Sequence, residues 1–386
     1  MEDIELVELV IKLTKRGETS TTQFKENIHN HNSLAQEMVA FSNSKGGTIL
    51  IGVNDKTWEI TGLKPDDIRR LTDMVVNVAN EHIKSPIFIE TQTIPIEDKM
   101  VMIVTIPEGV NKPYKDKDGL IFLKNGANKR KVTSNEELAR LLQSSGNLYA
   151  EQKLIRNSTY EDVNIDVFEN FYTQKYKQEF DREKLGNYIE NLDLGRDGKI
   201  NIACALFFTK RFERNIPGVF IAAVWFKGNE RSGNEYWNSK NLTGRLDQQY
   251  EAAYAFIINA LLKKQVHKSF NSNDEYEIPE IVIQELLVNA LVHRDYFIND
   301  TIKIFIYQNR IEIISPGVLP NNLTTEKIKR GIRKKRNPII DSFAYDLLEY
   351  RGVGSGIIRA LQAYPDIEFF NDIEGEEFVV TIKRPE

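Results

Sequence analysis

The chain has 386 residues, more than one hydrophobic core usually serves, so two or three domains are expected. Its 41% hydrophobic and 28% charged residues are typical of a folded protein, and its net charge of −5 excludes a polycation. The single cysteine, Cys204, excludes an intramolecular disulfide, and no apolar run is long enough to cross a bilayer. We therefore expect a cytoplasmic protein without a membrane partner, with Cys204 as a small core residue rather than a catalytic thiol.

Helix and strand signals alternate over the first 150 residues. Apolar periodicity predicts helices at 32–43, 65–82 and 133–142, the last with Ser134 and Glu137 spaced as a capping box. Strands are predicted by β-branched and apolar runs at 21–25, 46–53, 87–95, 100–106 and 119–124. The pattern favours a compact α/β or α+β domain over residues 1–148.

The middle of the chain has a weaker pattern. Residues 151–200 are polar with a helical period, and two apolar runs within 200–226 predict a pair of strands. Residues 247–263 are helical in pattern, and the polar stretch 268–279 ends in a proline, which is typical of a boundary. We assign residues 149–270 to a linker domain.

Residues 271–386 form the third predicted domain, and the chain is classed as a multidomain α/β and α+β protein. In chain order the predicted elements are a helix at 279–293, strands at 301–307 and 310–314, helices at 337–348 and 355–363, and a strand at 376–383.

The run "IQELLVNALVHRDY" places polar residues along an otherwise apolar helix. Glu285, Asn289 and His293 are spaced four apart and so lie on one helical face. A buried polar stripe must meet partners or a ligand, whereas a helix edge facing water needs neither. Both interpretations are open on this stretch alone.

Two later stretches favour a ligand. "EIISPGVLP" leaves a strand through a Pro-Gly turn, and "RGVGSGIIRAL" is a glycine-rich loop that opens into a helix. Glycines at a helix start let backbone N–H groups approach an anion, and the helix dipole adds to the attraction. The three stretches in this order predict a phosphate site.

The C-terminal part resembles the GHKL-type ATPase module of gyrases and histidine kinases, in its divergent RecG-related form. "QELLVNALVHRDY", "EIISPGVLP", "RNPII" and "RGVGSGI" carry the resemblance. It implies an α/β sandwich that binds ATP and Mg²⁺, with Asn289 holding the metal and Glu285 orienting the attacking water. It also marks, as positions at the nucleotide, His293, Ser315, Gly317, Arg336, Asn337, Gly352, Gly354 and Gly356. Ser315 stands where the wider superfamily has an adenine-reading aspartate, which weakens the expected adenine contact.

A basic segment, "KIKRGIRKKR" at 327–336, lies between these motifs and holds seven Lys or Arg in ten positions. A solvated helix face, a mobile lid that contacts phosphate, and a surface for nucleic-acid backbone remain equal alternatives.

A second basic stretch occupies residues 111–131, with seven Lys or Arg against two Asp, and with Tyr114 and Phe122 between the charges. Such a stretch suits phosphate contact and base stacking. The alternative is a solvated hairpin whose aromatic residues belong to the core.

The stretches "ETSTTQFKENI", "MVAFSNSKGGTILIGVND" and "ITGL" resemble the bacterial Schlafen AlbA-type domain over roughly residues 5–145. The resemblance implies binding of DNA or RNA, to which we assign Lys25, Lys124, Lys129, Arg130 and Lys131. Residues 203–218 and 244–257 also resemble the linker domain that joins these two modules in bacterial proteins.

The nuclease members of the Schlafen family are understood to use three carboxylates. Mapped here, the first is Glu18, the second is replaced by Gln23, and the third falls where Asn54 stands beside Asp55. Because a divalent cation needs charged oxygens, Glu18 and Asp55 would hold a metal weakly. We therefore expect nucleic-acid binding without cleavage.

The combined hypothesis is an ATP-responsive nucleic-acid-binding protein that acts in transcription regulation or phage defence. An ATP-gated metal-dependent nuclease and a non-catalytic interaction protein are the alternatives. Helicase activity is not expected, because the sequence has no P-loop motif. Whether the chain forms a homo-oligomer is left open.

Overall fold

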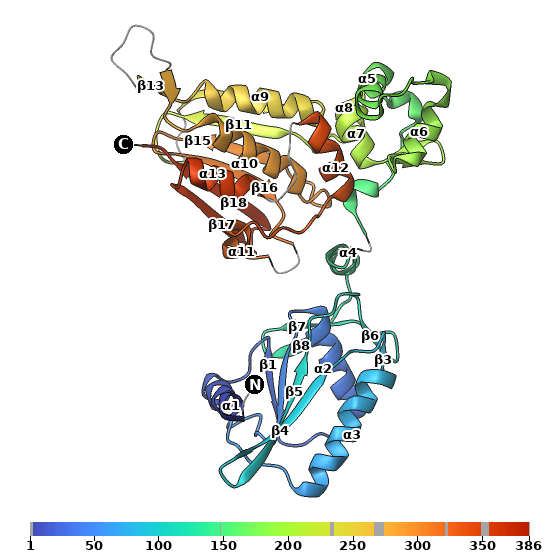
Figure 1. The fold of residues 1–386 in the computed structure, drawn as a ribbon, viewed down its shortest axis with the longest axis vertical. Helices are drawn as coiled ribbons and strands as arrows, with labels where there is room; N and C mark the ends of the chain where they lie inside the picture. Colours follow the sequence, from blue (N-terminus) through green and yellow to red (C-terminus); the bar gives the residue numbers. More distant parts are fainter. Residues whose placement is uncertain are drawn as a thin grey trace. The chain divides into compact units, whose positions relative to one another are not determined.

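The computed structural model describes residues 3–146, 148–231, 235–265, 274–320, 323–348 and 355–385 (Figure 1). The chain divides into an N-terminal unit, Met1–Leu148, and a C-terminal unit, Tyr149–Glu386. Among the described residues, no helix is both long and apolar enough to span a membrane.

The N-terminal unit is built on a four-stranded sheet in the order β1-β2-β5-β4. Its strands are β1 Thr22–Lys25, β2 Gly47–Ile51, β5 Lys99–Ile106 and β4 Glu90–Ile96. β1 pairs with β2 in parallel, and the other pairs are antiparallel. One face packs on α1, and the other packs on α2 and α3, as Figure 1 shows; these helices are Asp3–Arg16, His31–Asn43 and Pro65–Glu81.

Alternation along β2 explains the two layers. Ile49 and Ile51 join the core under α2 and α3, whereas Leu50 between them joins the core under α1. The remaining elements are short: β3 Ile83–Lys84 pairs with β6 Lys115–Asp116, β7 Phe122–Asn125 pairs with β8 Asn128–Lys131, and α4 is Asn135–Ser144. As predicted, Ser134 caps α4 by accepting a hydrogen bond from the Glu137 amide.

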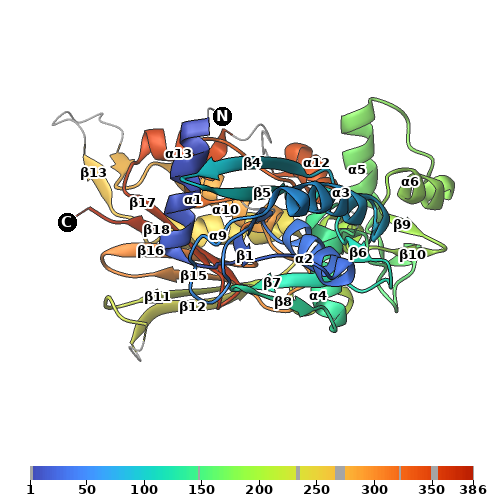
Figure 2. The ribbon, with the colours of Figure 1, turned by 90° about the horizontal axis from the view of Figure 1, so that it is seen from below.

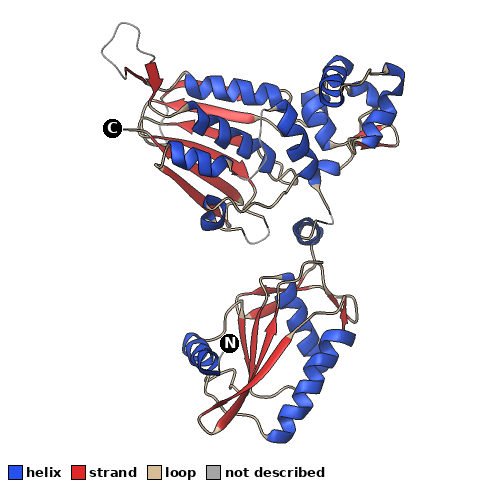
Figure 3. Cartoon of the chain, viewed as in Figure 1, coloured by secondary structure: helices blue, strands red, loops and turns tan. Residues whose placement is uncertain are grey.

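The C-terminal unit is built on a six-stranded sheet in the order β12-β11-β15-β16-β18-β17. The strands are Tyr236–Leu242, Ile221–Phe226, Ile302–Ile306, Arg310–Pro316, Glu377–Lys383 and Ile367–Asp372. Only the β11–β15 pair among them is parallel. Helices α9, α10 and α13 cover one face (Figure 3); they are Leu246–Ile258, Glu280–His293 and Gly356–Ala363.

The other elements of this unit lie around the sheet. Figures 1 and 2 show α5 and α6 at one end of the unit and the β13 strand at the other. The helices are α5 Ile165–Tyr176, α6 Leu185–Asn191, α7 Ile202–Phe208, α8 Phe212–Asn215, α11 Thr325–Lys329 and α12 Pro338–Leu347. Single turns are η1 Ala150–Gln152, η2 Tyr160–Asp162 and η3 Arg182–Lys184. Two small hairpins are β9 Gly195–Arg196 with β10 Lys199–Ile200, and β13 Lys263–Gln265 with β14 Asp274–Tyr276.

The prediction of two strands within 200–226 is wrong for the first apolar run and right for the second. Residues 202–208 form α7, and only 221–226 form a strand. Asn201 begins the helix by accepting a hydrogen bond from the Cys204 amide at 2.9 Å. Residues 203–208 are all buried, and a short apolar run buried on every side has no periodicity to tell helix from strand. Cys204 is a core residue, and burial raises the pKa of its thiol.

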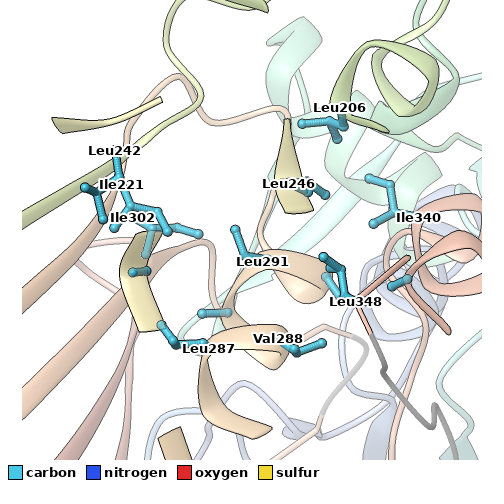
Figure 4. Close-up of a cluster of buried hydrophobic side chains, with 14 of the residues drawn as sticks. Leu206, Ile221, Leu242, Leu246, Leu287, Val288, Leu291, Ile302, Ile340 and Leu348 are labelled. Carbon is cyan, nitrogen blue, oxygen red and sulfur yellow. The ribbon is translucent and has the colours of Figure 1, made fainter. Parts of the chain in front are cut away.

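The C-terminal unit has a continuous core across the boundary predicted near residue 270. β11 and β12, which precede it, join the sheet formed by later strands. Figure 4 shows Leu206, Ile221 and Leu246 in one cluster with Leu291 and Ile302. Residues 149–270 therefore contribute to the same core as residues 271–386, which short-range patterns could not reveal.

Candidate functional site

The polar stripe of α10 lies on a helix that is otherwise packed in the core. Nine of its fourteen residues are buried, including Glu285. The side-chain amide of Asn289 donates to the Glu285 carbonyl at 2.6 Å. Its side-chain oxygen is thus the atom that Asn289 can offer to a cation. The solvated-edge interpretation fails for Glu285, which is only 8% exposed.

The first residue of α13 lies directly against this stripe. A Cβ added at Gly356 would come within 2.3 Å of Glu285 Oε2 and 3.3 Å of Asn289 Nδ2. A larger residue at this position would displace the Glu285 side chain or shift α13. The predicted phosphate glycines Gly352 and Gly354 lie outside the described residues, so Gly356 alone of the three is placed.

Glu285 is also paired with Arg359 on α13. The Arg359 guanidinium donates through Nε at 2.9 Å, and through a terminal nitrogen, to Glu285 Oε1. Its other terminal nitrogen donates to Ser355 Oγ at 3.0 Å. Neither Arg359 nor Ser355 was singled out from the sequence, although the spacing of Arg359 from Gly356 places it one helical turn away.

A cavity, here called the α10 cavity, opens beside the stripe and is lined in part by Asn289, His293, Ser315, Gly317 and Gly356. Its walls also include apolar residues of α10, α11, α13, β17 and β18, among them Leu286, Ile328, Ile357, Phe369 and Phe378. An apolar cavity with a few convergent polar groups is the usual form of a small-molecule site. With Arg336, six of the predicted nucleotide positions therefore meet at one cavity.

Ser315 and Gly317 shape the β16 side of the α10 cavity. The Ser315 hydroxyl donates to the Ala290 carbonyl at 3.3 Å, which leaves its oxygen as an acceptor. Gly317 has a φ of +101°, and a Cβ there would come within 2.5 Å of Asp295 Cβ. The Pro-Gly turn thus requires glycine for both conformation and space.

His293 ends α10 at the cavity wall. Burial lowers the pKa of its imidazole to about 4, with Asp341 opposing this shift and Arg336 adding to it. The ring is neutral at pH 7, so it has one nitrogen that donates and one that accepts.

Arg336 and Asn337 hold the end of α10. The Arg336 guanidinium donates to the His293 carbonyl at 3.0 Å and to the Val318 carbonyl, which fastens α10 to the Pro-Gly turn. Asn337 donates to the carbonyls of Val292 and Arg294 at 2.9 and 2.8 Å. Arg336 lines the α10 cavity and Asn337 does not. The predicted nucleotide contact of Asn337 thus gives way to a structural role in the described protein.

The basic segment 327–336 runs along the same cavity. Arg333 and Lys334 line it, together with Gly331 and Ile332. Asp341 on α12 lies 3.2 Å from an Arg333 nitrogen and 2.7 Å from Lys335 Nζ. Part of the segment is therefore next to the predicted phosphates, while part is neutralised by a carboxylate that is 4% exposed.

The carboxylate positions mapped in the N-terminal unit have different partners. Glu18 Oε1 accepts hydrogen bonds from Gln23 Nε2 at 2.7 Å and from the Phe24 amide at 2.8 Å. Asp55 is exposed and lies 3.8 Å from Lys25 Nζ, while the Asn54 amide donates to Glu26. No group of three or more metal-binding side chains occurs among the residues that the structure describes.

Lys124, predicted to contact nucleic acid, is instead an internal cation. Its side chain is 0% exposed, and its ammonium donates to Gln23 Oε1 at 2.8 Å and to the Ala127 carbonyl at 2.7 Å. It also lies 3.5 Å from Glu37 Oε1 and over the Phe41 ring. Burial lowers the pKa of Lys124, with Glu37 opposing this. Glu37 was missed, although a charged residue among the inward-facing Leu34, Met38 and Phe41 was a signal in the sequence.

The other predicted cations are more accessible. Lys129 lies 3.8 Å from Glu37 and donates to Ser33, and Arg130 is paired with Glu137. Lys131 and Arg130 are exposed at the end of the β7–β8 hairpin. Tyr114 and Phe122 are 7% and 8% exposed and belong to the core, so base stacking on them is excluded in this conformation.

Comparisons with known proteins match both parts of the chain. Residues 18–133 match the family model described as "Schlafen, AlbA_2", and residues 299–382 match "Putative ATP-dependent DNA helicase recG C-terminal". The chain therefore combines an AlbA-type domain with a RecG-related ATPase-type domain, as the resemblances predicted. α10 lies before residue 299, so the matched region does not include Glu285 or Asn289.

Two solved structures are also similar. The DIP2311 protein from Corynebacterium diphtheriae covers 100% of this chain and 82% of its own, at 17% identity and a TM-score of 0.49. The N-terminal domain of a RecG-related protein from Nitrosomonas europaea covers 33% of this chain and 90% of its own, at 24% identity and a TM-score of 0.26. No match was found among curated proteins.

Proposed function

We propose that the chain binds Mg-ATP in the α10 cavity and nucleic acid through its N-terminal unit. The observation that carries the first part is the meeting of Asn289 and Gly356 beside a cavity that Ser315 also lines. An amide oxygen suits a hard cation, and the glycine leaves space for phosphate oxygens. A serine oxygen can accept a hydrogen bond from the adenine amino group.

The residues fit Mg-ATP in chemistry as well as in place. Asn289 would hold the metal, which neutralises phosphate charge when bound. His293, neutral at pH 7, would add a hydrogen bond rather than a charge. Arg333 and Lys334 would face the phosphates from the basic segment. Glu285 would orient the water in a slow hydrolysis, so ATP would act chiefly as a conformational ligand.

Calorimetry tests the ATP proposal. Asn289→Ala should weaken Mg-ATP binding by about 10-fold or more, as removal of a metal-supporting group usually does. Asn238→Ala, on the edge strand β12, removes the same group far from the cavity and should bind as the wild type does. Glu285→Ala should retain binding and lose hydrolysis. A wild type without affinity for millimolar Mg-ATP contradicts the proposal.

Nucleic-acid binding would use the exposed end of the β7–β8 hairpin, Arg130 and Lys131, with Lys25 and Lys129 beside them. The matched AlbA-type region contains all four residues. Whether the ligand is DNA or RNA is an outcome of the test, which is a titration with both kinds of duplex and with single strands. A role in transcription regulation or phage defence, in the cytoplasm, fits such a protein.

The alternative of a metal-dependent nuclease is disfavoured by the surroundings of Glu18. Its Oε1 accepts a hydrogen bond from the side-chain amide nitrogen of Gln23. The oxygen of the same amide accepts a hydrogen bond from the Lys124 ammonium. Incubation with labelled tRNA, single-stranded DNA and duplex DNA in Mg²⁺ or Mn²⁺ should give no cleavage. Cleavage that Glu18→Ala abolishes would restore the nuclease hypothesis. Failure to bind either nucleotide or nucleic acid would leave the interaction protein as the answer.

A further inference from the structure

Glu285, the residue proposed to orient water, is held by a single arginine in the described protein. α10 and α13 pack side by side, and Arg359 reaches Glu285 across 74 positions of sequence. The Glu285 side chain is 9% exposed and that of Arg359 is 29% exposed. A partly buried pair of this kind is retained more firmly than a surface ion pair.

Arg359 engages one of the two carboxylate oxygens of Glu285. Oε1 accepts two hydrogen bonds from the Arg359 guanidinium, and Oε2 faces Gly356, where an added Cβ would come within 2.3 Å of it. Charge-assisted hydrogen bonds to an arginine are about twice as strong as neutral ones. Release by Arg359 would therefore free Oε1 to accept a hydrogen bond from water.

Arg359 does not itself line the α10 cavity, but its side chain reaches the first turn of α13 beside Gly356, which does line it. Its remaining terminal nitrogen donates to Ser355 Oγ, the residue before Gly356. A guanidinium binds phosphate oxygens with the same bidentate geometry that it uses for a carboxylate. A phosphate beside Gly356 would thus compete with the Glu285 carboxylate for the Arg359 guanidinium.

We propose that Arg359 is a positioning residue that holds Glu285 when no nucleotide is bound and moves to the terminal phosphate of a bound nucleoside triphosphate. The released carboxylate then takes a proton from water, the water oxygen bonds to the terminal phosphorus, and the bond to the bridging oxygen breaks. The products are the nucleoside diphosphate and inorganic phosphate. This inference rests on the proposed function of the α10 cavity.

The contact predicts that Arg359 distinguishes triphosphate from diphosphate. Full-length Arg359→Ala should lose at least about 10-fold in affinity for the non-hydrolysable β,γ-imido analogue of ATP, and no more than about 3-fold for ADP. Arg310→Ala is the matched control, because Arg310 forms a similar pair with Glu312, outside the cavity lining, with side chains 26% and 18% exposed. Its affinities for both ligands should equal those of the wild type.

Competition between Glu285 and phosphate gives a second, opposite prediction. Glu285→Gln weakens the hold on Arg359, so its affinity for the analogue should rise by about 3- to 10-fold. The double variant Glu285→Gln/Arg359→Ala should show no such rise in affinity. A structural role of Arg359 would not make the effect of Glu285→Gln depend on the arginine.

The outcomes separate this inference from the proposed function. A wild type that binds neither nucleotide overturns both. A wild type that binds both nucleotides, with a triphosphate-to-diphosphate ratio that Arg359→Ala leaves unchanged, overturns the inference alone. Equal losses for the two nucleotides would make Arg359 a structural residue and overturn it as well.

Discussion

In the N-terminal unit, the ammonium of Lys124 is enclosed by Glu37 and Gln23, whereas in the C-terminal unit Asn289 and Gly356 meet beside an open cavity. Lys124 and Asn289 were both assigned to binding from the sequence with the help of a family resemblance. Lys124 was assigned from a basic stretch, and Asn289 from its spacing on one helix. Spacing fixes the relative position of side chains, but a charge run does not say which carboxylates will face it.

The largest expected effect comes from breaking the internal pair of the N-terminal unit. Lys124→Met leaves Glu37 buried with only the more distant Lys129 near it, and should lower the free energy of unfolding by about 3 kcal/mol. Lys131→Met, at an exposed position of the same hairpin, should change it by no more than about 0.5 kcal/mol. Hydrogen exchange of the β1 and β2 amides measures this unit by itself. Equal effects would make Lys124 a surface cation after all.

Among its buried carboxylates, each unit has one whose partners are worth comparing, Glu37 and Glu151. Glu37 faces two lysines, but Glu151, near the start of the C-terminal unit, accepts the backbone amides of Ile339 and Ile340 at 2.8 and 2.7 Å. These amides begin α12, where the helix dipole favours a negative charge. Burial nevertheless raises the pKa of Glu151 to about 7, with Asp341 adding to the shift and Lys335 opposing it.

Glu151 therefore predicts a pH dependence of the folding stability. Because its pKa is raised on folding, from 4.5 to about 7, the folded state keeps a proton that the unfolded chain loses. This contribution is present below about pH 4.5 and is lost as the pH rises through 7, a change of about 3 kcal/mol at most. Burial of His293 acts oppositely, since its stability contribution is lost as the pH falls from 6.5 towards about 4.

The comparison of wild type with Glu151→Gln isolates the carboxyl group. Urea unfolding of the full chain at pH 5, 6, 7 and 8 should show wild type losing stability relative to the variant as the pH rises. His293 contributes equally to both proteins and cancels in the difference. A difference that is constant over this range would contradict the raised pKa.

Adding a methyl group tests the close approach in the C-terminal unit. Gly356→Ala places a Cβ within 2.3 Å of Glu285 Oε2, so the Glu285 side chain or α13 must move, at a cost of up to about 1–3 kcal/mol and with weaker Mg-ATP binding. Gly228→Ala is the control, because a Cβ there meets nothing within 4 Å. Calorimetry and thermal unfolding measure the two effects. Unchanged binding in Gly356→Ala would remove the glycine from the site.

Reversing the charge of the accessible cations in the N-terminal unit should have a smaller effect, on nucleic-acid affinity at a fixed salt concentration. Reversing Lys129, Arg130 and Lys131 to Glu should weaken binding to every nucleic acid, because backbone contacts act through counterion release. The slope of log affinity against log salt should fall by about 2 to 3. Lys383→Glu, an exposed cation of the C-terminal unit, should leave the slope unchanged. A triple variant that binds like the wild type would show the hairpin to be merely solvated.

Local patterns predicted most elements of both units, and long-range pairings account for the errors. β15 and β16 and helices α10, α12 and α13 were expected within a few residues of their observed bounds. That β11 lies beside β15 depends on pairing between residues 221–225 and 302–306, which no local pattern encodes. The enclosure of Lys124 likewise depends on Glu37, 87 positions away.

The candidate site likewise contains residues that local spacing could place and contacts that only long-range packing determines. Glu285, Asn289 and His293 could be aligned because one helix carries them, and Ser315 and Gly317 because one turn does. Arg359 could not be assigned to Glu285 from the sequence, because the packing of α10 on α13 determines that contact. The structural role of Asn337 depends similarly on carbonyls at the end of α10.

The smallest expected effect concerns Ser315, where adenine selectivity would originate. Its hydroxyl donates to the Ala290 carbonyl, so only its oxygen remains to accept from an adenine amino group. Ser315→Ala should therefore weaken ATP binding by about 5-fold, the loss expected for one neutral hydrogen bond. GTP carries a carbonyl in place of that amino group and gains nothing from the serine oxygen, so its affinity should stay the same. Calorimetry with both nucleotides gives the ratio, and equal losses would show that Ser315 supports β16 rather than reading the base.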